Sequence, residues 1–114
     1  MCFVGTGCGL FTLDEPYERW NVTVSYIEED DVVQAEPQRL EVHGPRGEIR
    51  VNNSTRVDRG FKIDDLGIAL ELDDSSSSRI TVSGAQDGET YAFVDHLHRG
   101  GPRGVIVVDY IRQD

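Results

Sequence analysis

The residues best suited to chemistry stand together near the C-terminus, in the stretch YAFVDHLHRGGPRGVIVV (91–108). Asp95, His96 and His98 form a short Asp-His-x-His run, and imidazole and carboxylate groups are common metal ligands in proteins. In an extended segment alternate side chains share a side, so His96 and His98 would lie together while Asp95 faces away. His43 adds a third imidazole only if folding brings it close. The run therefore indicates either a divalent-metal site or a polar loop whose exposed histidines bind nothing.

Alternation of apolar and polar residues predicts the strands that hold this loop. RWNVTVSYI (19–27) is the clearest case, since every second residue from Trp20 to Tyr26 is apolar. Further strands are predicted within 39–44, 44–53, 60–72, 79–84, 90–94 and 104–111. The acidic run 28–31 should end the first strand, and DDSSSS (73–78) should be a loop. No long segment has a helical period, so the fold class is all-β, a sandwich or barrel.

The two cysteines lie far from the histidine loop, at positions 2 and 8 of MCFVGTGCGLF (1–11). This apolar stretch with its Gly-Cys pair resembles the end of a lipoprotein signal, in which Cys8 would carry the lipid anchor. An ordinary N-terminal strand is the alternative. We therefore separate 1–13 from a single domain at 14–114, and expect an extracytoplasmic protein at the cell surface or anchored to the membrane.

The charge of the chain limits its partners. A formal net charge of −10 argues against binding nucleic acid and against docking on an anionic membrane. Lys62 is the single lysine among eleven basic residues. An acidic, lysine-poor composition is typical of halophilic proteins, and a GC-rich genome would also replace lysine by arginine.

Three segments, in order, resemble the cupredoxins, including the copper domain of cytochrome c oxidase subunit II. EPQRLEVHGPRGEIRVNN (36–53) is similar to a run in which a proline and a strand precede a Gly turn and a strand ending in Asn-Asn. RVDRGFKIDDLGIALEL (56–72) is similar to the segment that follows the first copper ligand, and DGETYAFVDHLHRGGPRGVIVV (87–108) to the C-terminal ligand hairpin. The resemblance implies a Greek-key β-sandwich of the cupredoxin type.

The resemblance also implies where copper ligands would stand. The first His position holds Arg59, the Cys position holds Asp95, the second His is His98, and the weak axial Met position holds Arg103. A blue-copper site needs a thiolate and two imidazoles, whereas arginine remains protonated and cannot coordinate. One of the four ligands is thus retained, and we expect no copper cofactor.

Two hypotheses remain for this degenerate copper site. In the first, Asp95 accepts hydrogen bonds from Arg59, Arg103 or both, and an Arg–carboxylate cluster replaces the metal. In the second, Asp95, His96 and His98 form a non-standard site for copper or another metal.

No catalytic constellation is present, so we do not expect an enzyme. The chain has no cysteine near a histidine, no Gly-x-Ser-x-Gly turn and no phosphate-cradling loop before a helix. The expected function is a binding or accessory module with an unidentified protein partner. A metal-binding or electron-transfer cupredoxin and an immunoglobulin-like adhesion module are the alternatives, and a dimer through an edge strand stays open.

Overall fold

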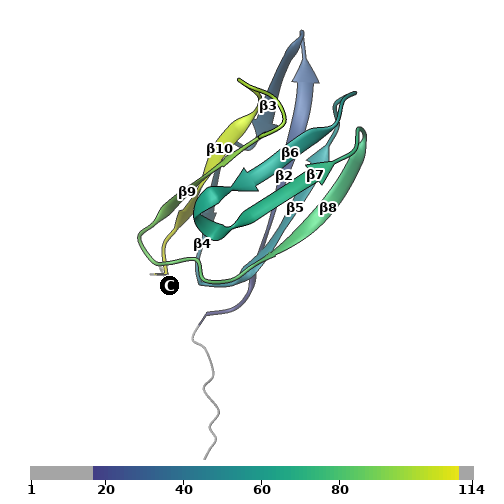
Figure 1. The fold of residues 1–114 in the computed structure, drawn as a ribbon. Coiled ribbons are helices and arrows are strands. Elements are labelled where there is room, and N and C mark those ends of the chain that lie inside the picture. The colour runs from purple at the N-terminus through teal and green to yellow at the C-terminus, as the bar shows by residue number, and fades with distance from the viewer. Residues whose placement is uncertain (1–16, 111–114) are drawn as a thin grey trace, which may run out of the picture.

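The computed structural model describes residues 17–110, which form two packed β-sheets (Figure 1). One sheet has the order β4-β10-β9-β6-β7 and the other the order β3-β2-β5-β8. The strands are β2 (Trp20–Glu29), β3 (Val32–Glu36), β4 (Arg39–Val42), β5 (Gly47–Asn53), β6 (Arg59–Ile63), β7 (Ile68–Leu72), β8 (Ser76–Val82), β9 (Thr90–Val94) and β10 (Arg103–Val108), with a 3₁₀ turn η1 (Asp64–Leu66). The predicted all-β class is confirmed.

Both sheets are mixed, because the chain crosses between them. β2 pairs in parallel with β5, and β10 in parallel with β4, while the remaining pairs are antiparallel. Parallel neighbours cannot be joined by a tight hairpin, so the chain must leave the sheet and return between them. This connectivity is that of a Greek-key sandwich. The described part of the chain contains no helix that is long and apolar enough to cross a membrane.

The core lies between the sheets and follows from the alternation in the sequence. In β2, Val24 and Tyr26 are fully buried and Thr23 is exposed, as the alternation predicts. Phe61 of β6 stacks on Phe93 of β9 with ring centroids 5.0 Å apart. Burying one such side chain contributes roughly 1.5–3 kcal/mol, so this pair anchors the centre of the larger sheet.

The hairpin between β2 and β3 differs from the sequence expectation. β2 continues to Glu29, and β3 was not predicted at all. The chain reverses at Asp30 and Asp31, whose φ angles of 53° and 65° are the left-handed values that a two-residue type I′ turn requires. Aspartate tolerates this conformation better than most residues, so the acidic run makes the turn of a longer hairpin.

Two further segments show how turns and strands divide the middle of the chain. The segment 60–72 divides into β6 and β7 around η1, and Gly67 closes the turn with a φ of 68°. The serine run 73–78 is only partly a loop, because β8 begins at Ser76. Ser76 and Ser77 pair with Asn53 and Asn52 of β5, so the neighbouring strand supplies the hydrogen bonds that make this polar stretch a strand.

The C-terminal strands carry the apolar residues predicted for them. Tyr91 of β9 is buried, and its hydroxyl accepts a hydrogen bond from the backbone N–H of Gln86 at 3.1 Å. This bond ties the start of β9 to the preceding loop, as in a tyrosine corner. The β9–β10 loop, the β5–β6 loop and the β2–β3 hairpin gather at one end of the sandwich, opposite the end at which β2 begins (Figure 1).

Candidate functional site

Asp95 is the centre of a buried polar network at the loop-rich end. It follows Phe93 by two residues, so the pleat of β9 turns its carboxylate inward, and its side chain has no exposed surface. Oδ1 accepts hydrogen bonds from the backbone N–H of Gly60 at 2.7 Å and of Leu97 at 3.0 Å. Oδ2 lies 3.3 Å from Nη1 of Arg59. Both carboxylate oxygens are therefore engaged by the protein.

Arg59 supplies the positive charge that balances Asp95. It is the first residue of β6, and only 11% of its side chain is exposed. Besides the ion pair, its Nε donates to Oγ1 of Thr55 at 3.1 Å. Two buried charges are tolerated when they are paired and their remaining hydrogen-bonding groups are satisfied. The structure thus brings together Arg59 and Asp95, as the first hypothesis expected.

Sequence reasoning missed the next members of the network, Asn53 and Thr55, which are both buried. Oδ1 of Asn53 accepts from the backbone N–H of Thr55 at 3.0 Å and lies 2.7 Å from its hydroxyl oxygen. Nδ2 of Asn53 donates to the carbonyls of Val57 and Asp73, at 2.9 and 3.0 Å. An asparagine followed two residues later by threonine at the end of a strand is a turn signal, and here it fixes the loop that precedes Arg59.

Tyr26 reaches the same network from the other sheet. Its hydroxyl donates a hydrogen bond to the carbonyl of Gly60 at 2.8 Å, so Gly60 is held by Tyr26 on one side and by Asp95 on the other. Burial raises the pKa of the Tyr26 phenol well above its ordinary value. The negative charge of Asp95 raises this pKa further, and the positive charge of Arg59 opposes the rise.

The two histidines of the loop take different positions. His98 directs Nε2 to the carbonyl of Asp58 at 2.7 Å. Because a carbonyl only accepts, Nε2 carries a proton in this bond. The exposed His96 lies against Gly60, where an added Cβ would stand 2.4 Å from its Nδ1. A side chain at position 60 would therefore displace the His96 ring, and both rings rest on the segment that contains Arg59.

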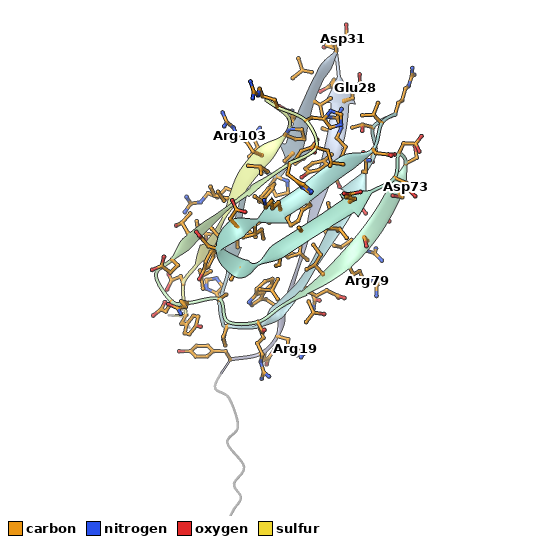
Figure 2. All side chains as sticks on the ribbon, in the orientation of Figure 1. Arg19, Glu28, Asp31, Asp73, Arg79 and Arg103 are labelled. Atoms are coloured by element: carbon orange, nitrogen blue, oxygen red, sulfur yellow. The ribbon has the colours of Figure 1, made fainter. Side chains whose placement is uncertain are left out.

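Arg103 does not join Asp95. Among the hydrogen bonds and ion pairs of the described residues, none links the two side chains. Arg103 pairs with Val94 in the β9–β10 register, and both residues are exposed, whereas Asp95 is buried. Alignment by ligand spacing placed Arg103 in the cluster, but the pleat of β10 turns it outward. Its label lies at the outer rim of the loop-rich end in Figure 2.

Among the described residues, no preformed set of ligands supports a metal site at Asp95, His96 and His98. Within residues 17–110 no three His, Cys, Asp or Glu side chains are grouped so that they could hold a metal ion. His43 is not part of this loop, because its Nδ1 bonds the carbonyl of Asp109 at 2.6 Å. Cys2 and Cys8, with the expected lipid anchor, lie outside the described residues.

Comparisons with known proteins identify the family of this chain and solved structures with a similar fold. A family model described as cupredoxin-like domain matches residues 14–108. Among solved structures, auracyanin A, a blue copper protein from Chloroflexus aurantiacus, superposes with a TM-score of 0.64 at 11% identity, over 81% of this chain and 100% of that one. Copper nitrite reductase from Nitrosomonas europaea gives a TM-score of 0.63 at 15% identity, over 81% of this chain. This chain spans 42% of the reductase chain, and at such identities both likenesses concern the fold alone. A search of curated proteins gave no match.

Proposed function

The chain belongs to the cupredoxin-like domain family, and we propose that it is a copper-free member that acts as a non-catalytic binding or accessory module outside the cytoplasm. One observation carries this proposal. The buried Arg59–Asp95 ion pair occupies two of the positions at which the resemblance implies copper ligands. The paired charges and their hydrogen bonds fill the place of a metal centre with protein groups.

The residues at these positions do not fit copper. Arg59 remains protonated and offers no lone pair to a metal. Asp95 is a hard oxygen donor, and its oxygens already accept from two backbone N–H groups and from Arg59. His98 alone keeps a coordinating side chain, and one imidazole does not make a type 1 site. These residues therefore support no copper-dependent step.

The network instead gives the loop-rich end a fixed framework. It connects the end of β5, the start of β6 and the end of β9 through side chains that are all buried. Above this framework two of the exposed large apolar residues are presented to solvent, Val57 at 43% and Leu97 at 40%. Rigid support under exposed apolar side chains suits a surface that binds another protein.

Extracytoplasmic location rests on the N-terminal sequence. The Gly7-Cys8 junction after an apolar stretch supports export and lipid attachment at Cys8. Expression in a lipoprotein-competent bacterial host with radiolabelled fatty acid tests this directly. We expect label on the wild-type chain and none on Cys8→Ser; an unlabelled wild-type chain in the cytoplasmic fraction contradicts export.

Copper titration of the full chain tests the central part of the proposal. The background is Cys2→Ser/Cys8→Ser, which removes the only thiols from the chain. We expect no stoichiometric Cu(II) or Cu(I) binding by calorimetry, and no protein-bound Cu(II) signal by electron paramagnetic resonance. Binding of one copper that disappears in His96→Ala/His98→Ala would overturn the proposal and make the 95–98 loop a metal site.

A further inference from the structure

The outer face of the smaller sheet carries an unusual pair of like charges. Arg50 of β5 and Arg79 of β8 are direct partners in the antiparallel register. The neighbours of Arg50 along its strand, Ile49 and Val51, are fully buried, so Arg50 points outward. Arg79 is likewise exposed, and its label stands outside β8 in Figure 2, away from the other sheet.

The pairing brings the two guanidinium groups within reach of one ligand. Directly opposed residues in an antiparallel ladder have Cα atoms about 4.5–5.5 Å apart, and like charges in such a pair repel. Among the described residues, neither Arg50 nor Arg79 has an ion-pair partner within 4.0 Å. The chain as a whole has a net charge of −10. Two adjacent positive charges that form no ion pair with a carboxylate therefore make this part of the surface unusual.

The surroundings of the pair form a shallow pocket of about 240 Å³. Thr23 of β2 is the parallel partner of Arg50, and Asn21 stands two residues before it on the same face. Their hydroxyl and amide groups add neutral hydrogen-bond donors beside the two arginines. Since a water occupies about 30 Å³ in the liquid, the pocket has room for a small hydrated anion.

We propose that Arg50 and Arg79 bind a small oxyanion with two negative charges, of the phosphate type. A guanidinium group presents paired N–H donors that match phosphate oxygens, and two of them offset more of the charge of a dianion than one could. Thr23 and Asn21 donate to the remaining oxygens. The acidic remainder of the chain repels long polyanions, so a compact soluble phosphate group fits better than nucleic acid.

The carboxylate of Glu48 allows a second test of anion binding at this pocket. It lines the same pocket, and its register partners are Asn21 and Thr81, one step along the face from the arginines. A carboxylate there opposes a bound anion. Replacement by glutamine keeps the size and removes the charge, so Glu48→Gln should bind phosphate more tightly than the wild-type chain.

A titration of the full chain with inorganic phosphate, followed by NMR of the arginine side-chain N–H groups, tests the inference. We expect saturable shifts centred on Arg50 and Arg79. Arg50→Gln or Arg79→Gln should weaken binding about tenfold or more, as the loss of a charge-assisted hydrogen bond predicts. Arg50→Lys/Arg79→Lys should keep some affinity, because the charge remains while the paired donors are lost.

Sodium chloride at matched ionic strength is the control. Equal shifts with chloride, or shifts that survive in Arg50→Gln/Arg79→Gln, would overturn the proposal. Dispersed spectra establish that each variant is folded, and both arginines are exposed, so their replacement leaves the core intact. The outcome is independent of copper binding, because these side chains lie on the solvent face of the smaller sheet, whereas Arg59 is buried.

Discussion

The buried Arg59–Asp95 pair and the exposed Arg50–Arg79 pair use arginine in opposite ways. Arg59 faces a carboxylate from which water is excluded, and it bonds Thr55 as well. Arg50 faces another arginine in open solvent, with no carboxylate partner among the described residues. At the first site every charge is balanced within the chain, so the site has a structural role. At the second site Glu48 lines the same pocket but forms no ion pair with either arginine, so the remaining balance must come from solvent or from a ligand.

Removal of Asp95 should have the largest effect. Asp95→Ala leaves Arg59 buried without its counter-charge and leaves the N–H groups of Gly60 and Leu97 without their acceptor. Breaking a buried pair in this way costs about 3–5 kcal/mol of the free energy of unfolding. Urea denaturation measures it.

The matched control replaces both charges, in Arg59→Met/Asp95→Leu. It should recover much of the lost stability, because no unpaired charge remains and only backbone N–H groups lack acceptors. If the double variant is as unstable as Asp95→Ala, the charge pairing is not what stabilises this end of the sandwich.

Loss of the Thr55 hydroxyl should have the next largest effect. Thr55→Val keeps the shape but removes the acceptor for Nε of Arg59 and the hydroxyl bonded to Asn53. An unsatisfied buried polar group costs about 1–3 kcal/mol. Thr55→Ser retains the hydroxyl and should lose clearly less in the same denaturation series; equal losses would mean that the methyl packing, and not the network, matters.

Tyr26 should make stability depend on alkaline pH. Its pKa is raised in the folded chain, so the unfolded chain loses the phenol proton first, from about pH 10 upward. The contribution is complete below that pH and is lost as the pH rises toward the folded-state pKa. Tyr26→Phe should cost about 1 kcal/mol at neutral pH through the lost bond to Gly60. Tyr26→Phe should also make the fall in the free energy of unfolding above pH 10 less steep. If that fall is unchanged in the variant, other titrating groups cause it.

Replacement of one arginine in the exposed Arg50–Arg79 pair should have the smallest effect on stability, and it should stabilise the chain. In phosphate-free buffer at low salt, Arg79→Gln should raise the melting temperature slightly, because it relieves repulsion with Arg50. The gain should stay below about 1 kcal/mol and should vanish at high salt, where exposed charges are screened. A melting temperature that falls at low salt would show that the arginines do not repel in the folded chain.

The parts of the fold that sequence could predict are those set by local patterns. Alternation identified β2, and the order of the cupredoxin-like segments placed Arg59 beside Asp95, although 36 residues separate them in the chain. β3 was missed, because an aspartate pair looks like the end of a strand and not like a hairpin turn. Arg103 was misplaced because counting from a ligand pattern ignores the pleat. Thr55 could not be identified, since its partner Arg59 depends on how the loop before β6 closes.

Restoring the ligands by substitution tests the central claim most directly. Arg59→His/Asp95→Cys, made in the Cys2→Ser/Cys8→Ser background, supplies an imidazole and a thiolate beside the retained His98. Circular dichroism first establishes that the variant is folded, and Cu(II) is then added while visible absorption and electron paramagnetic resonance are recorded. If the ion pair stands in place of the metal, the variant gains one copper and a strong thiolate absorption, and the parent gains neither. Stoichiometric copper bound equally by the parent, or a folded variant that binds none, would contradict the account.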